Sequence, residues 1–143
     1  AGTGTKDAKA MFTDFRITER RKSPERRLYE DGKWVCYGIY FDYGAATLRG
    51  QSSATLRQIG ELLKKDPTLN LRIEDNTNDK ENDADNLRLS QWRAEVVQDY
   101  LVKKYNLPKD RLKIKGWGAV RPLGPLDTPD GIEMNRRVEF FKM

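Results

Sequence analysis

The chain has 143 residues, of which 37% are hydrophobic, 34% charged and 10% aromatic, and its formal net charge is +5. This length suits one domain with its own core, and the aromatic content argues against a disordered chain. Histidine is absent, which removes the commonest general base and metal ligand, and the single cysteine, Cys36, excludes an internal disulfide.

The first 30 residues differ in character from the rest. Ala1–Thr5 is glycine-rich, Arg20–Arg27 is basic, and Met11–Ile17 has the pattern of a short edge strand. We interpret residues 1–30 as a linker or an ordered lead-in arm, whose basic run is either solvated or in contact with an anionic surface. We place the domain itself at residues 31–143. No apolar run reaches the ~20 residues that span a membrane, so we expect no transmembrane segment here, and any signal or anchor would lie upstream.

The first half of the domain predicts a strand, a helix and a second strand. Lys33–Phe41 is rich in β-branched and aromatic residues, as buried strands are, and Cys36 within it is predicted to be an inert core thiol. Either Ser52 or Ser53 is expected to cap the following helix, which ends at Asp66 because a residue before proline leaves helical geometry. Apolar and polar residues then alternate over 69–74, which predicts a strand.

The loop Asp75–Asp85 is almost without apolar residues, and Asp83 or Asp85 is expected to cap the next helix. The loop lacks the glycine and the glutamate spacing of a helix-loop-helix calcium site, so we expect no metal there.

Residues 86–105 predict a long helix with one apolar stripe, made of Leu89, Trp92, Val96, Val97, Tyr100 and Leu101. Arg93 falls inside this stripe, at ~100° per residue. A charge on a core-facing arc either reaches an edge, pairs within the protein or meets a bound anion. From geometry, pairing within the protein and a role in holding a ligand carboxylate both stay open.

Two strands and a loop complete the domain. Leu112 and Ile114 alternate with lysines in a strand that Gly116–Gly118 ends, residues 121–131 are interpreted as a loop, and the last strand is Arg137–Phe141. The order is strand, helix, strand, helix, strand, strand. Because crossovers are right-handed, we predict a two-layer α/β sandwich, a mixed sheet with both helices on one face.

Four pieces of the sequence resemble the OmpA-like domain, the C-terminal peptidoglycan-binding family shared with MotB and peptidoglycan-associated lipoprotein. They are Gly38–Asp42, Ile73–Asn78, the stretch Asn86–Ala94 that matches N-x-x-L-S-x-x-R-A, and Arg111–Gly118 followed by Asn135–Glu139. The resemblance covers about residues 34–143 and implies the β-α-β-α-β-β fold.

The resemblance also implies a function without catalysis or cofactors. Such a domain anchors an outer-membrane or envelope protein to the cell wall, on the periplasmic side of the outer membrane, by gripping diaminopimelate of the peptidoglycan stem peptide. Any membrane tether would lie upstream, and no nucleic-acid partner is expected. The positions that match the family's ligand-binding residues are Arg93, Asn78, Thr77, Asn86, Asp42 and Arg136.

One departure from the family bears on function. The family's G-H-T-D motif, whose aspartate holds the ligand ammonium, is replaced here by Asp75–Asn78, so that Asn78 stands 15 positions before Arg93 where the aspartate belongs. Losing a charge-assisted hydrogen bond costs about tenfold in affinity. Asp75 and Asp79 are possible charge substitutes. An anchor that still binds and a degenerate domain with a structural or assembly role both fit, whereas no acid–base machinery for an enzyme is evident.

Overall fold

The computed structural model describes residues 22–143, and its sheet has four strands. The strands are β1 (Lys33–Cys36), β2 (Leu71–Asn76), β3 (Leu112–Gly118) and β4 (Arg137–Lys142), in the order β1-β4-β2-β3. β2 and β3 run parallel, whereas β4 is antiparallel to both β1 and β2. The expected edge strand over 11–17 and the first two residues of the basic run, Arg20 and Arg21, lie outside the described residues.

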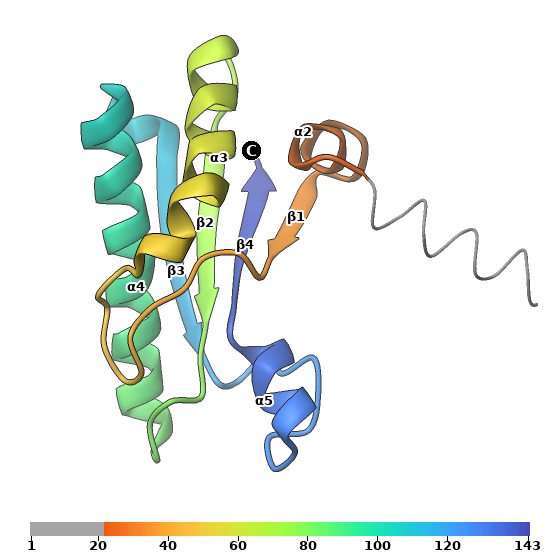
Figure 1. Cartoon of the computed structure of the whole chain (residues 1–143), viewed down its shortest axis with the longest axis vertical. Coiled ribbons are helices and arrows are strands. Elements are labelled where there is room, and N and C mark those ends of the chain that lie inside the picture. The colour runs from red at the N-terminus through yellow and green to blue at the C-terminus, as the bar shows by residue number, and fades with distance from the viewer. Residues whose placement is uncertain (1–21) are drawn as a thin grey trace, which may run out of the picture.

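Two long helices cover one face of this sheet, α3 (Ser53–Lys65) and α4 (Asp83–Tyr105) (Figure 1). They approach closely at Gly60, where a Cβ atom would lie 2.1 Å from the Tyr105 ring. Their buried leucine, isoleucine and valine side chains form one core with Ile73 and Phe140 of the sheet. This arrangement confirms the predicted two-layer sandwich with a mixed sheet. No helix within residues 22–143 is both long and apolar enough to cross a membrane.

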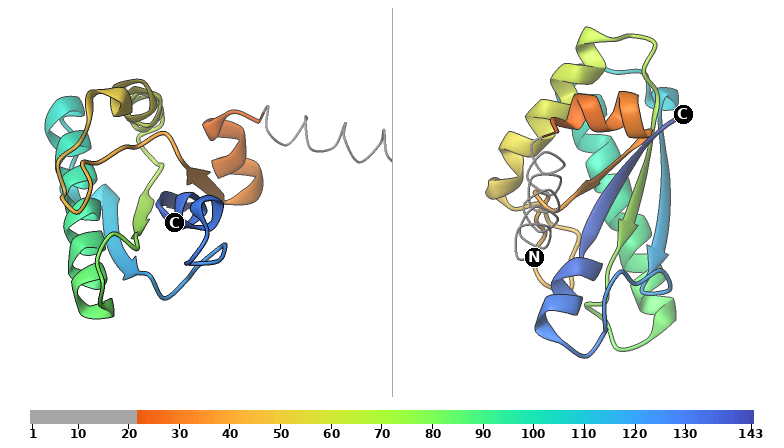
Figure 2. Two further views of the ribbon diagram at one scale, coloured as in Figure 1. Left: turned by 60° about the horizontal axis from the view of Figure 1, so that its bottom comes forward. Right: turned by 90° about the vertical axis from the view of Figure 1, so that its right-hand side faces the viewer.

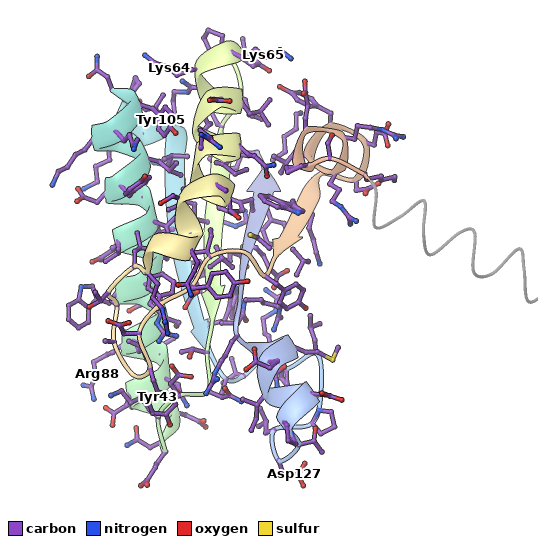
Figure 3. The ribbon with its side chains drawn as sticks, in the orientation of Figure 1. Tyr43, Lys64, Lys65, Arg88, Tyr105 and Asp127 are labelled. Atoms are coloured by element: carbon purple, nitrogen blue, oxygen red, sulfur yellow. The ribbon has the colours of Figure 1, made fainter. Side chains whose placement is uncertain are left out.

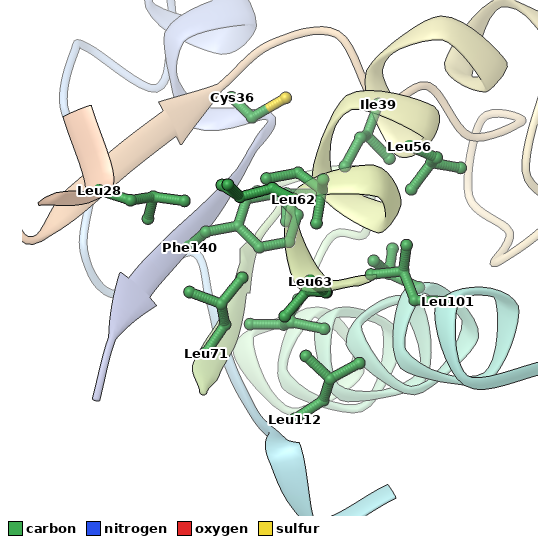
Figure 4. Close-up of a cluster of buried hydrophobic side chains, with 14 of the residues drawn as sticks. Leu28, Cys36, Ile39, Leu56, Leu62, Leu63, Leu71, Leu101, Leu112 and Phe140 are labelled. Atoms are coloured by element: carbon green, nitrogen blue, oxygen red, sulfur yellow. The ribbon is translucent and has the colours of Figure 1, made fainter. Parts of the chain in front are cut away.

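A short helical segment precedes β1, formed by α2 (Pro24–Arg26) and a π-helical turn (Arg27–Asp31). Leu28 of this segment is fully buried and belongs to the hydrophobic core. Figure 4 shows its side chain pointing toward Phe140. The packed unit therefore includes the end of the segment that sequence reasoning assigned to the lead-in arm.

The predicted strand over 33–41 is shorter than expected and ends at Cys36. Farther along, the backbone of Tyr40 pairs with a side chain and not with a neighbouring strand. Ser52 Oγ accepts from the Tyr40 N–H (2.7 Å) and donates to the Tyr40 carbonyl (3.0 Å). Ser52 consequently does not cap α3 with its side chain. The segment that follows Cys36 leaves the sheet and forms one wall of a cleft.

Three further expectations were wrong in detail. Asn82 caps α4 instead of an aspartate, because its side-chain oxygen accepts from the Asp85 N–H at 2.8 Å. Trp92, expected in the core stripe, is 59% exposed. The region read as a loop contains the start of α5 (Pro129–Asn135), with proline in the first turn and a cap from Thr128. Figure 2 shows α5 at one end of the sheet.

We expect Leu28→Ala to lower the free energy of unfolding by about 2–5 kcal/mol, as removal of a fully buried leucine side chain does. Chemical denaturation measures it, with Leu87→Ala as the control, since Leu87 is 42% exposed on α4. Equal effects of the two substitutions would show that the segment before β1 does not belong to the folded unit.

Candidate ligand-binding cleft

A cleft of about 580 Å³ opens at the end of the sheet where β2 finishes and β4 begins. The segment from Tyr37 to Arg49 forms one wall and α5 contributes another. Its lining is rich in charged and aromatic side chains: Tyr37, Ile39, Tyr40, Phe41, Tyr43, Arg49, Asp75, Asn76, Asp79, Arg93, Glu133, Met134, Arg136, Arg137 and Val138.

Arg93 on α4 is buried, with 4% of its surface exposed, and joins two loops at this cleft. Nε donates to the Ala45 carbonyl (2.8 Å), Nη1 to Thr77 Oγ1 (2.9 Å), and Nη2 to the Asp42 carbonyl (3.1 Å) and Asp79 Oδ2 (2.8 Å). These bonds use four of the five N–H groups of a guanidinium, which leaves one on Nη1. Pairing within the protein is thus present, and the same side chain still lines the cleft.

Asp79 is the anion at the centre of the cluster. Oδ2 accepts from Arg93 and from the Gly44 N–H (3.0 Å), and Oδ1 accepts from Arg136 Nε (2.7 Å). Burial raises the pKa of this carboxyl, but the hydrogen bonds from Gly44 and Arg93 outweigh it, and the pKa lies below its usual range. Asp79 is therefore ionised at neutral pH and holds two arginines at once.

Thr77 and Asn86 fix the conformation of the loop that carries Asp79. Thr77 is fully buried, and its backbone N–H donates to the Gly118 carbonyl (3.0 Å), which fixes the loop to the end of β3. The Asn86 side chain accepts from the Lys80 N–H (2.9 Å) and donates to the Lys80 carbonyl (3.1 Å). Asn86 therefore shapes the loop that carries Asp79, and it is absent from the lining of the cleft.

Two of the residues singled out by sequence take unexpected positions. Asp42 is exposed, and Arg93 uses its backbone carbonyl, so its carboxylate is not part of the cleft lining. Asn78 is half-buried, its Oδ1 has no hydrogen-bond partner in the described residues, and it too is absent from the lining.

Arg136 sits where α5 meets β4 and is the more accessible cation of the pair, with 33% of its side chain exposed. Besides its ion pair with Asp79, it lies 3.4 Å from Glu133 and 5.5 Å from the centre of the Tyr43 ring. Tyr43 is 75% exposed and is labelled in Figure 3. A ligand that enters the cleft would therefore meet the Arg136 guanidinium before it meets Arg93.

Asp75 lines the same cleft but has a different environment. It is 2% exposed, and its Oδ2 has no hydrogen-bond partner among the described residues. Burial raises the pKa of Asp75 well above its usual range, and the nearby charge of Asp79 adds to this, although Arg93 and Arg137 oppose it. Asp75 therefore holds its proton more strongly than an exposed aspartic acid does.

Sequence reasoning missed the aromatic wall and one buried ion pair. Tyr37, Tyr40 and Tyr43 all line the cleft and are 46%, 48% and 75% exposed. Buried strands also contain tyrosines, so composition gave no signal that these rings face solvent. Arg137 pairs with Glu139 (3.0 Å) although both are nearly fully buried, which the strand alternation did not reveal.

The cleft therefore combines four arginines with three carboxylic acids. The formal charge of the lining is therefore positive, which suits an anionic group. Carboxyl groups beside the arginines also suit a cation, so the arrangement complements a zwitterion better than a simple anion.

A family model described as the OmpA family matches residues 40–136. Among curated proteins, the chain is 32% identical over 101 residues to outer membrane porin F of Pseudomonas aeruginosa, covering 71% of this chain and 29% of that protein. It is 33% identical over 101 residues to the peptidoglycan-binding protein ArfA of Mycobacterium tuberculosis, covering 71% of this chain and 31% of that protein. The chain thus corresponds to about three tenths of either relative.

Solved structures agree with this assignment. The peptidoglycan-associated lipoprotein of Burkholderia pseudomallei superposes with a TM-score of 0.66 at 26% identity, covering 73% of this chain and 88% of that one. The periplasmic domain of Helicobacter pylori MotB superposes with a TM-score of 0.63 at 19% identity, covering 77% of this chain and 79% of that one, a likeness of fold. Family model, relatives and architecture all point the same way: this chain belongs to the OmpA family.

Proposed function

We propose that this domain binds peptidoglycan without catalysis and anchors an envelope protein to the cell wall by gripping diaminopimelate of the stem peptide. The observation that carries the proposal is the buried Asp79 held between Arg93 and Arg136 at the cleft. A family arginine at this position supports a carboxylate-binding role. The anion beside it restores a negative charge that Asn78 lacks.

In this proposal the ligand's carboxylate binds at the arginine pair. Arg136 is half-exposed and Arg93 retains one N–H on Nη1, so together they offer donors to two carboxylate oxygens. The ammonium of the same amino-acid centre is placed against the acids Asp75 and Asp79. Thr77 and Asn86 hold the loop, and Asp42 contributes its backbone.

The names of the relatives support a location in the cell envelope. ArfA is named as a peptidoglycan-binding protein, and the solved relatives include a peptidoglycan-associated lipoprotein and a periplasmic MotB domain. Porin F is named as an outer membrane protein. We propose that this domain lies on the periplasmic side of the outer membrane.

A degenerate domain with a structural or assembly role is the second candidate. It is favoured because hydrogen bonds within the domain already use four of the five N–H groups of Arg93, and because position 78 is asparagine. In that case the arginine ties loops together, and the cleft binds no stem peptide.

We expect Arg136→Ala to weaken binding of meso-diaminopimelate by about tenfold to a hundredfold, because one charge-assisted contact is worth ~1.5–3 kcal/mol. Isothermal titration calorimetry measures it. Arg88→Ala is the matched control, since Arg88 is 75% exposed on α4 and pairs with Asp85. Saturable binding by the parent that survives Arg136→Ala unchanged would move the carboxylate elsewhere. No binding by a folded parent would favour the degenerate domain.

We expect Arg93→Lys to abolish measurable binding and to lower stability, because lysine keeps the charge but cannot supply the guanidinium fork to Thr77, Asp79 and two carbonyls. Titration with a diaminopimelate-containing stem peptide and chemical denaturation measure the two effects. Full-strength binding by Arg93→Lys would assign Arg93 a purely structural role.

A further inference from the structure

We propose that Asp75 supplies the carboxylate that receives the ligand's ammonium, and that this carboxyl gives up a proton when the ammonium enters. The inference rests on the proposed function and deepens it, because it assigns the charge missing at position 78 to one residue. The step forms no covalent bond. The O–H bond of Asp75 breaks, the proton goes to solvent, and the carboxylate accepts hydrogen bonds from the ammonium.

The first reason is the number of hydrogen-bond acceptors still available on each acid. Asp79 already accepts three hydrogen bonds, from Gly44, Arg93 and Arg136, and a carboxylate has about four acceptor sites. Asp75 Oδ2 accepts none. Of the two acids that line the cleft beside Arg93, Asp75 is the one with an unused oxygen.

The second reason is the cost of leaving that oxygen unpaired. Buried polar atoms in folded proteins nearly always have a partner, and an unpaired carboxylate oxygen costs free energy until it meets a donor. Asp75 is 98% buried and belongs to the lining of the cleft, and Oδ2 is its carboxyl oxygen without a partner. An alkylammonium carries donors and no acceptor, which makes it the matching group.

The third reason is the charge around Asp75. It faces Arg93 from α4, Arg137 from β4, and Asp79 from the loop that follows β2. Its neighbours across the sheet, Gly116 on β3 and Val138 on β4, bring no charge.

Arg93 and Arg137 are themselves paired with Asp79 and Glu139, so their fields at Asp75 are reduced. Burial then favours the protonated form of the acid when no ligand is bound. An ammonium adds an unpaired positive charge next to it and reverses this balance.

Proton release is measured by titrating the domain with meso-diaminopimelate at pH 7 in two buffers of different ionisation enthalpy. We expect the observed enthalpies to differ by the amount that about one released proton per ligand produces. In Asp75→Asn the release should disappear and affinity should fall about tenfold or more, because a neutral amide replaces the charge. Asp127→Asn is the control, since Asp127 is exposed in the loop before α5 (Figure 3).

Pimelate provides a matched ligand, because it has the same carbon chain and both carboxylates but no amino group. It should bind more weakly than meso-diaminopimelate and release no proton. Equal proton release with pimelate would mean that the carboxylates, and not an ammonium, drive the titration, which would overturn the assignment.

The protonated state of the empty cleft is tested separately by stability. A buried acid with a raised pKa stabilises the fold below the ordinary pKa of aspartate and loses that contribution as pH rises toward the raised value. Asp75→Asn should therefore raise the denaturation midpoint relative to the parent at pH 7, and the difference should shrink by pH 4. A variant that is no more stable than the parent at pH 7 would contradict a protonated Asp75.

The outcomes separate this inference from the proposed function. Saturable binding by the parent with no proton release, and undiminished in Asp75→Asn, overturns the role of Asp75 and leaves peptidoglycan binding intact. No binding of meso-diaminopimelate by the folded parent overturns the proposed function and this inference together.

Discussion

The buried ion pair between Arg93 and Asp79 is the interaction on which the rest of the cleft depends. It joins the segment that leaves β1, the loop after β2 and the helix α4, three parts of the chain that the sheet alone does not bring into contact. Removing one partner of a buried pair leaves an uncompensated charge, which costs several kcal/mol. The pair is stabilised further by the Gly44 N–H, which donates to Asp79, and by Thr77 Oγ1 and two backbone carbonyls, which accept from Arg93.

This constraint explains how a chain without the family's aspartate keeps a charged cleft. Asp79 follows Asn78 by one position and supplies the anion that orients two arginines. Asp75 precedes it by three positions and lies buried with one unpaired oxygen. In the proposed function, Asp79 orients the two arginines and Asp75, near the end of β2, receives the cation.

The fold could be predicted from sequence because the periodicity of the two long helices and of the strands is strong and the family motifs are specific. Arg93 could be singled out for the same reason, since a charge within an apolar stripe demands a partner. Its partner could not be identified. Asp75, Asn78 and Asp79 are alternatives at the level of sequence, and the choice depends on how the loop turns after β2. The start of α5 had a sequence signal, because Thr128 is a capping residue and Pro129 follows it. The many prolines around it led instead to the prediction of a loop.

The proposed function requires this cleft to bind a zwitterionic amino-acid centre. The sharpest test is to titrate isotopically labelled domain with meso-diaminopimelate and to follow backbone and arginine side-chain N–H signals by NMR. Binding in the cleft should give saturable shifts that cluster at Thr77, Asp79, Arg93 and Arg136. Shifts confined to other surfaces of the domain, or none at ligand concentrations of several millimolar, would contradict it.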